Sequence, residues 1–519
     1  MKMQGWCRII VLGAICLLAV LAPVGQAPLA AATTLRIATN GDLSNPDLHF
    51  SVVLVDRTVL LNVYEFLFAL GEDLSIKPVL VDKYTVSPDG LVYTLTLRRG
   101  VKFHNGKTLS SADVVYTLIR MQNKGPRATE FKKLMKSIDA VDPLTVRITL
   151  REVSAGFLTA LANPIAPAVI YPEGEVERQG GSITKPVGTG PFEFVEWKKD
   201  NVIRLRRFKD YTVDPRPTSG FAGKREALVD QVDFIPIRDS SVRASALERG
   251  DVDVAIDLTQ QDLERNKGRA GLTISVKPSL TIRDLRFGFK KGSFANNVKL
   301  RQAVAYAIDK EEVVRAVHFG LGKPAPAAIP PGTPYFSAVH ANDPFAHPNV
   351  EKAKQLMKEA DYKGEEIVLE AHMQPDTIAQ TAVVLQSQLQ AAGLNVRVRT
   401  LESAAVQMAL NNGDFAFFLS GLTVRPDADI YYCQFWESTT TAYGYKSAEY
   451  DRLCDAGRRT VKHEERVKVY ADLETILRSE VPWIPIVLTP TIDGWRTSVT
   501  GWNHWAAGYA RAWNVTVGK

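Results

Sequence analysis

Several features that would place the chain in a special structural class are scarce or missing. Only four cysteines occur in 519 residues, so no dense disulfide framework holds the fold. The 63 basic and 57 acidic residues almost balance at a net charge of +6, without the basic block or tail typical of nucleic-acid binding. Past the N-terminus, no run approaches the ~20 apolar residues of a membrane-spanning helix. Disordered, fibrous, multi-span membrane and nucleic-acid-binding classes are therefore excluded.

The composition that remains is that of an ordinary globular protein. Hydrophobic residues make up 45% of the chain and charged residues 23%. The length is about three times the ~150 residues of a typical domain, which predicts more than one domain. A chain of this size buries well over half of its unfolded surface, so its core needs no metal or disulfide.

The first 32 residues have the order of a secretory signal peptide. Lys2 and Arg8 are positively charged, residues 9–21 carry no charge, and three alanines end at Ala32. The alternative is a membrane anchor, but thirteen residues are too short to span ~30 Å of hydrocarbon. Cys16 lies inside the apolar run rather than after it, so we expect no lipid anchor. We expect cleavage after Ala32 and export of the mature chain.

Two cysteines and two histidines are the candidates for a structural or metal site. Cys433 and Cys454 are 21 residues apart and would pair in an oxidising compartment or stay as buried thiols, and the sequence leaves both open. His340 and His347 are the closest pair of histidines, in a proline-rich loop. We interpret them as solvated loop residues rather than metal ligands, and we expect no metal and no cofactor.

The hydrophobic patterns predict an α/β fold. Strict alternation at residues 91–97 indicates a strand, and Ser110 with Asp113 forms a capping-box pattern that opens a helix. Residues 59–70 form an apolar run, which we interpret as a helix. Two strand–helix–strand units predict parallel pairs with the helix outside the sheet. Their segments are residues 231–235, 240–250 and 252–256, and residues 367–371, 377–392 and 394–400.

Motifs for catalysis are missing from the sequence. It contains no Gly-x-Ser-x-Gly, and the Gly-Leu-Gly-Lys at residues 320–323 is followed by proline, unlike a phosphate-binding loop. Residues 188–190 (Gly-Thr-Gly) lack the third glycine of a dinucleotide site, and His463-Glu464 lacks the second histidine of a zinc protease. We therefore expect no enzyme, and an exported hydrolase acting on peptides or esters is kept as the alternative function.

Several spaced motifs resemble one family across the whole mature chain. The run Tyr-Thr-Leu-Thr-Leu-Arg-Arg-Gly-Val-Lys-Phe-His-Asn-Gly begins at Tyr93 and continues to residue 116. It resembles the signature of the dipeptide/oligopeptide/nickel group (family 5) of extracellular solute-binding proteins of ABC importers. Further motifs follow in that family's order at residues 185–192, 232–256, 300–309, 349–356 and 482–486.

The resemblance implies a periplasmic-binding-protein fold of type II, in the large form. Two α/β lobes are joined by hinge strands, and lobe I carries an extra subdomain. Mapped onto this chain, residues 1–32 are the signal peptide, and residues 33–278 with 485–519 form lobe I. The inserted subdomain covers about residues 60–185, and residues 279–484 form lobe II.

The resemblance also implies a function in capture and delivery. A peptide-like or other small polar ligand enters the cleft between the lobes, the lobes close, and the closed protein docks on permease subunits of an ABC importer. We expect a periplasmic monomer without catalytic activity or nucleic-acid partner. A family member acting as a chaperone or receptor is a third possibility, which stable protein partners would reveal.

The family's two peptide anchors are both altered in this chain. In its dipeptide binders an Asp after a lobe II strand binds the peptide amine, and at or near that position stands Arg425. The carboxylate-binding Arg before the long lobe II helix is missing, and His372 is the nearest candidate. Both departures favour a ligand with an anionic group facing lobe II. The alternatives are a salt bridge from Arg425 to Asp427 or Asp429, and a capping or core role for His372.

Three further residues complete the predicted ligand site. Tyr432 and Trp436 belong to an aromatic segment that would wall the cleft, because ligand pockets are largely apolar with few polar anchors. The same segment, which includes Tyr431 and Phe435, would equally serve as lobe II core. Asp42, in the polar loop after the first predicted strand, is assigned to the lobe I side of the site.

Overall fold

The computed structural model describes residues 32–290, 292–373, 376–439, 442–503, 505 and 507–518. Residues 33–519 form one compact unit, separate from residues 1–32. The predicted signal peptide therefore lies outside the described residues except for Ala32. Within the described part, no helix combines the length and apolar character needed to cross a membrane.

A sheet of eleven strands runs through the described part of residues 33–519. Its order is β15-β14-β16-β12-β17-β11-β1-β10-β9-β8, and β13 pairs with β17 beside this path. The strands are β1 (Thr34–Thr39), β8 (Phe192–Lys198), β9 (Val202–Arg207), β10 (Gln231–Pro236), β11 (Val254–Ala255), β12 (Leu272–Phe287), β13 (Lys323–Pro324), β14 (Ile367–His372), β15 (Val396–Leu401), β16 (Phe417–Leu422) and β17 (Trp483–Arg496).

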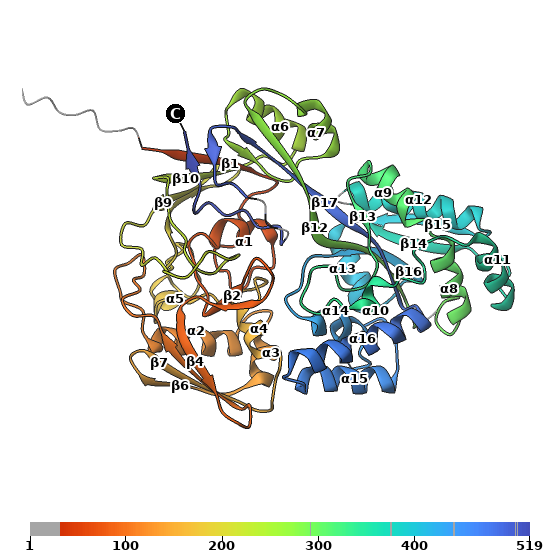
Figure 1. The fold of residues 1–519 in the computed structure, drawn as a ribbon, viewed down its shortest axis with the longest axis horizontal. Coiled ribbons are helices and arrows are strands. Elements are labelled where there is room, and N and C mark those ends of the chain that lie inside the picture. Colours follow the sequence, from red (N-terminus) through yellow and green to blue (C-terminus); the bar gives the residue numbers. More distant parts are fainter. Residues whose placement is uncertain are drawn as a thin grey trace, which may run out of the picture. The chain divides into compact units, whose positions relative to one another are not determined.

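The two longest strands, β12 and β17, connect the halves of this sheet. They pair antiparallel from Leu272 opposite Arg496 to Arg286 opposite Trp483. Toward one side β17 pairs with β11, and toward the other β12 pairs with β16. Figure 1 shows β12 in green and β17 in blue running alongside each other. The expected lobe boundaries at 278/279 and 484/485 fall inside these two strands.

We call the elements from β1 to β11, with β18 (Val499–Thr500) and β19 (Thr516–Val517), lobe I. Strand β1 pairs in parallel with both β10 and β11, and α6 (Ser240–Arg249) connects these two neighbours. This arrangement confirms the predicted strand–helix–strand unit. Helix α6 begins after Asp239, whose side chain accepts a hydrogen bond from the Val242 N–H, and ends at Gly250 in the left-handed conformation.

A second sheet within lobe I has its own apolar core. Its order is β4-β5-β7-β6, with β4 (Val81–Val86), β5 (Val92–Leu97), β6 (Met135–Asp142) and β7 (Thr145–Leu150). The predicted capping box is present: Ser110 and Asp113 exchange hydrogen bonds at the start of α2 (Ser111–Asn123). The nearby helices are α3 (Ala128–Leu134), α4 (Phe157–Ala162) and α5 (Glu175–Arg178).

The prediction of one helix over residues 59–70 is wrong. Helix α1 covers Leu54–Leu60, and the chain then turns into a short strand pair, β2 (Phe68–Leu70) with β3 (Ile76–Pro78). Residues 61–70 are all buried. A fully buried strand and a buried helix give the same continuous apolar run, so hydrophobicity alone cannot separate them.

We call the elements from α8 to α16, with β13 to β16, lobe II. Strands β15, β14 and β16 are parallel, and α12 (Asp376–Ala391) links β14 to β15, which confirms the second predicted unit. The other helices are α8 (Val298–Ala307), α9 (Lys310–His318), α10 (Ala338–Ala341), α11 (Val350–Glu359), α13 (Ser403–Asn412), α14 (Ala428–Trp436), α15 (Ala448–Arg459) and α16 (His463–Glu480), whereas α7 (Gln260–Asn266) precedes β12.

The Gly-Thr-Gly motif at residues 188–190 has a packing role. A Cβ on Gly190 would lie 2.7 Å from the carbonyl oxygen of Val63, and one on Gly188 would collide with the same atom. The N–H of Gly190 donates to that carbonyl at 2.8 Å. Only glycine allows the backbone to approach the end of α1 this closely.

Candidate functional site

Arg425 lies in the loop between β16 and α14, at the carboxyl end of a lobe II strand. The adjacent Val424 is buried in the apolar core of lobe I, so this loop reaches from one lobe to the other. The backbone N–H of Arg425 donates to the hydroxyl of Tyr431 at 2.8 Å. Ligand sites of α/β sheets lie beyond the carboxyl ends of the strands, which is where this loop begins.

The guanidinium of Arg425 carries unused hydrogen-bonding capacity. Its Nε is buried without a hydrogen-bond partner, and no carboxylate among the described residues forms an ion pair with it. Burial lowers the pKa of Arg425, and the nearby Arg57 and Arg286 lower it further. An arginine pKa starts so high that the side chain stays cationic at neutral pH.

Lobe I presents a second buried arginine near Arg425. Arg57 of α1 is 4% exposed, and its Nη1 donates to the hydroxyl of Tyr509 at 2.7 Å. Its other hydrogen bonds go to the carbonyls of Val52 and Val53. Both Arg57 and Arg425 act electrostatically on the Tyr509 hydroxyl. Two cations and one phenol from the two lobes therefore come together at this point.

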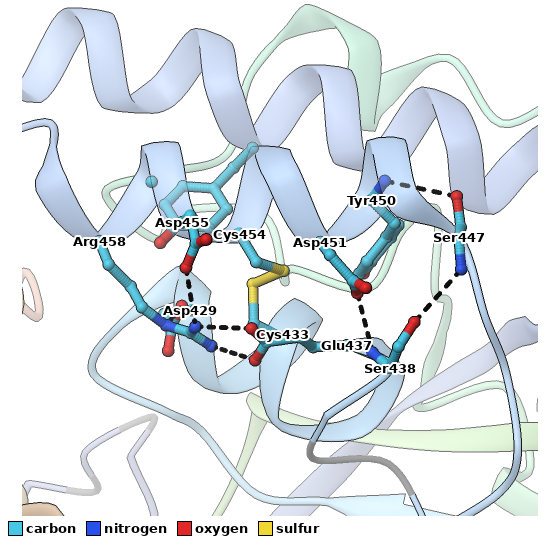
Figure 2. Close-up of a disulfide and its surroundings, with 12 residues drawn as sticks. Asp429, Cys433, Glu437, Ser438, Ser447, Tyr450, Asp451, Cys454, Asp455 and Arg458 are labelled. Atoms are coloured by element: carbon cyan, nitrogen blue, oxygen red, sulfur yellow. Dashed lines mark hydrogen bonds and ion pairs between the residues drawn. A yellow bond between two sulfur atoms is a disulfide. The ribbon is translucent and has the colours of Figure 1, made fainter.

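The expected salt bridge from Arg425 to Asp427 or Asp429 is not formed. Asp427 instead forms a bidentate pair with Arg466, with both N–O distances 2.7 Å. Asp429 accepts from Arg458 at 3.0 Å, and Arg458 also binds Glu437. Figure 2 shows the guanidinium of Arg458 between these carboxylates. Both aspartates are thus already paired within lobe II.

A cavity of about 370 Å³ lies between the inserted segment and the helices α14 to α16. Asp427, Arg466 and Arg458 line it from lobe II. Across it, the N–H of Ala155 donates to the carbonyl of Arg458 at 2.9 Å, which ties lobe I to lobe II. The volume is within the range of small-molecule pockets.

His372 is the last residue of β14 and is half-buried. Its ring packs edge-on against Phe418, with ring centres 5.6 Å apart. Burial lowers the pKa of His372, and Arg283 and Arg286 lower it further, so the imidazole is neutral at pH 7. The adjoining residues 374 and 375 lie outside the described residues.

Arg283 is a residue of this region that the sequence reasoning missed. It lies on the hinge strand β12, opposite Gly421 of β16. Its Nε is buried without a hydrogen-bond partner, and burial lowers its pKa to about 10. One signal was available: three charged residues, Arg283, Asp284 and Arg286, lie among apolar residues in the segment 282–287. Arg57 and Tyr509, 452 residues apart, gave no such local signal.

Tyr432 and Trp436 belong to the aromatic core of lobe II, which is the alternative that the sequence left open. Both are 0% exposed. The Tyr432 hydroxyl donates to Glu474 at 2.9 Å and accepts from His340 Nε2 at 2.8 Å. Neither side chain is accessible in this structure, so both belong to the core of lobe II.

The interpretation of His340 as a solvated loop residue is wrong. Its side chain is fully buried, and the N–H of Ser337 donates to His340 Nδ1 at 3.0 Å. Burial and the nearby Arg478 lower the pKa of His340 to about 4. His347 is exposed, and no group of metal-binding side chains occurs among the described residues.

Asp42 is engaged within lobe I. Its carboxylate accepts from Trp197 Nε1 at 3.0 Å and from the N–H of Asp200 at 2.7 Å. These bonds attach the loop after β1 to the end of β8, where Trp197 lies. No described contact joins Asp42 to Arg425.

The two remaining cysteines form a disulfide. Cys433 of α14 and Cys454 of α15 have Cα atoms 5.8 Å apart. The bond lies beside the Arg458 ion pairs, as Figure 2 shows. Of the two alternatives that the sequence left open, a disulfide and two free thiols, the structure has the disulfide. The bond links α14, which carries Asp429, to α15, which carries Arg458.

Comparisons with known proteins place this architecture in a family. The family model "Bacterial extracellular solute-binding proteins, family 5 Middle" matches residues 75–443. The chain belongs to family 5 of the bacterial extracellular solute-binding proteins. The glutathione-binding protein GsiB of Salmonella choleraesuis (strain SC-B67) is 28% identical over 492 residues, covering 91% of this chain and 92% of that protein.

Solved structures share the fold over nearly the whole chain. The binding protein AgaA from A. tumefaciens R10, solved with agropinic acid, is 27% identical with a TM-score of 0.78, and 94% of this chain and 99% of that chain align. DppA from Helicobacter pylori, solved with the peptide STSA, has a TM-score of 0.78 at 24% identity, with 94% and 99% covered. The chain therefore has the two-lobe fold of these binding proteins, and its family assigns it a role as an extracellular solute-binding protein.

Proposed function

We propose that this chain binds a small acid in the periplasm and delivers it to the permease subunits of an ABC importer. An anionic group of the ligand lies between Arg425 of lobe II and Arg57 with Tyr509 of lobe I. The protein acts as a monomer, without catalysis, after cleavage behind Ala32. Its lobes comprise residues 33–278 with 485–519, and residues 279–484.

The observation that carries this proposal is the unpaired state of Arg425. Arg425 is half-buried with its Nε enclosed, and a cation in such a place without a partner costs free energy. The loop that carries Arg425 crosses to lobe I, where Arg57 also has no carboxylate partner among the described residues. A carboxylate or phosphate would supply the missing acceptor for the guanidinium, through two parallel hydrogen bonds.

The names of two relatives agree with an acidic ligand. GsiB is named for glutathione and the AgaA structure for agropinic acid. Both ligands carry carboxyl groups. We infer the class of ligand from this agreement and from Arg425, and we leave the ligand's remaining structure to experiment.

The same two cations explain how a ligand would favour lobe closure. Arg57 and Arg425 repel each other when no anion lies between them. An anion converts this repulsion into two attractions, and closure then gains contacts that the open protein lacks. His372, half-buried at the carboxyl end of β14, contributes a neutral hydrogen-bonding side chain to the same side of lobe II.

Calorimetric titration of Arg425 variants tests the proposal, with the native ligand identified from molecules released on denaturation. We expect Arg425→Ala to lose about 2–5 kcal/mol of binding free energy, or ~30-fold to several thousandfold in affinity. Arg425→Lys should recover only part, because it keeps the charge and loses the planar fork. Arg425→Asp should not bind the ligand.

The matched control is Arg397→Ala, which removes one cation from the edge strand β15, where Arg397 pairs with Glu366. It should bind like the wild type. If Arg425→Ala stays within about threefold of wild-type affinity, ~0.65 kcal/mol, the guanidinium does not hold the ligand and the proposal is wrong.

A further inference from the structure

Several buried or half-buried arginines in the described part of the chain have no carboxylate partner, and their donors are used in different ways. Arg243 and Arg301 direct their donors to backbone carbonyls: Arg243 to Ile256, Ile237 and Asp257, and Arg301 to Glu480 and Phe294. These side chains hold the backbone, and Arg57 likewise donates to the carbonyls of Val52 and Val53. Arg283 and Arg425 differ, because the Nε of each is buried without any hydrogen-bond partner.

The position of Arg283 is specified by the glycine opposite it. Arg283 and Gly421 are neighbours in the pairing of β12 with β16. A Cβ at residue 421 would collide with Arg283 Nη1, so the guanidinium lies directly over the backbone of β16. The glycine has no positive φ that would require it for conformational reasons. Its lack of a side chain makes room for Arg283 at the carboxyl end of β16, four residues before Arg425.

The charge of Arg283 acts on two histidines. His372 at the end of β14 and His318 at the end of α9 both have their pKa lowered by burial and by the charge of Arg283. His318 is 5% exposed, and its Nε2 is buried without a hydrogen-bond partner. Arg283 and His318 thus combine a cation with an imidazole whose hydrogen-bonding capacity is unused.

We propose that Arg283, flanked by His318 and His372, is a second anion-binding site, and that the ligand carries two anionic groups. One group lies at Arg425 and the other at Arg283. This inference rests on the proposed function and extends it, since it restricts the ligand class from acids to dianions. Because Arg283 belongs to the hinge strand β12, the second group binds at the strand that joins the lobes.

Inorganic selenate, which has the shape of sulfate, is the probe for the test. Protein freed of ligand by unfolding and refolding is titrated calorimetrically. We expect two selenate sites in the wild type. Arg283→Gln should weaken one site at least about tenfold and leave the other, as expected when hydrogen bonds to a charged group are lost. Arg425→Gln should remove the other site, and the control Arg397→Gln should keep both.

A second variant, Gly421→Ala, tests the position of the Arg283 guanidinium without removing any charged group. Gly421→Ala forces Arg283 off the strand, so it should weaken the Arg283 site and leave the Arg425 site unchanged. Arg283→Lys should restore part of the affinity that Arg283→Gln loses. If Arg283→Gln fails to fold, these two variants carry the test. Anomalous scattering from selenium in crystals then locates each bound ion.

The possible failures are distinguishable. Suppose that the wild type, Arg283→Gln and Gly421→Ala all bind selenate at a single site with equal affinity, and that Arg425→Gln does not bind it. This result would overturn the second site and leave the proposed function intact. If no variant, nor the wild type, binds selenate at Arg425 or Arg283, both proposals are wrong.

Discussion

Two sets of arginines, one on the lobe II helices α15 and α16 and one beside strand β16, differ in the partners of their guanidinium groups. Arg466 and Arg458, on α16 and α15, are surrounded by acceptors. Arg466 binds Asp427, the hydroxyls of Tyr335 and Tyr470, and the carbonyl of Gly457. Arg425 and Arg283 each have a buried Nε without a partner. The first set holds lobe II together, whereas the second set has donors available for a ligand.

Whether the guanidinium of an arginine has its partners within the protein therefore distinguishes charges that hold the fold from charges that bind a ligand. A buried ion pair adds little net stability relative to an apolar replacement, but removal of one partner leaves an uncompensated charge. A half-buried cation without a carboxylate partner, such as Arg425 or Arg283, already bears part of that cost in the free protein. Its replacement should therefore leave stability unchanged or raise it, and the loss should fall on ligand binding.

The largest expected effect is on stability, at Arg466. Replacement by Met leaves Asp427 buried at 4% exposure without its guanidinium. We expect Arg466→Met to lower the free energy of unfolding by about 3–5 kcal/mol. Urea unfolding followed by circular dichroism measures it.

Arg425→Met is the matched variant for this comparison. Its ligand-free free energy of unfolding should equal or exceed that of the wild type. A loss as large as that of Arg466→Met would mean that Arg425 has a structural role, and the contrast between the two sets would be broken.

The next largest effect concerns the disulfide, which lies beside the ion pairs of Arg458 (Figure 2). Cys433 and Cys454 close a segment with a sequence separation of 21 residues. Replacing both by Ser should cost about 3 kcal/mol, mainly because the unfolded chain gains freedom. Unfolding under non-reducing conditions measures this, and wild type in reductant should show the same loss. A change well below 1 kcal/mol would show that the two helices are held without the bond.

The smallest effect is a pH dependence from the core under the site. The pKa of His340 is lowered to about 4, so the unfolded chain binds a proton there before the folded protein does. The stability contribution is complete above pH 6.5 and is lost as the pH falls toward 4. We expect His340→Asn to reduce this acid loss by on the order of 1 kcal/mol between pH 7 and 5. Unfolding titrations at the two pH values measure it, and an unchanged pH dependence would contradict it.

Local patterns predicted the elements that depend on neighbouring residues. The capping box of Ser110 and Asp113 and the end of the predicted helix at residue 250 depend on a few neighbouring residues, and both are present. The α/β class followed from the same patterns. The apolar run at residues 59–70 fits a buried helix and a buried strand equally well, so the sequence could not decide between these two structures.

Of the candidate site, the sequence indicated only residues whose own type is unusual at their position. Arg425 is informative because of its charge at a particular place in the chain. Arg57 and Tyr509 meet across 452 residues, and Arg283 meets Gly421 across 138, so no spacing reveals either contact. The sequence also did not reveal which side chains are buried. His340 belongs to a proline-rich segment and is nevertheless fully buried. Such facts depend on the packing of distant segments.

The most direct test of the account is mass spectrometry of small molecules released on denaturation from the wild type, Arg425→Ala and Arg397→Ala. The account predicts an acid from the wild type and from Arg397→Ala, and its loss from Arg425→Ala. A neutral or purely cationic molecule, released equally from all three proteins, would contradict it.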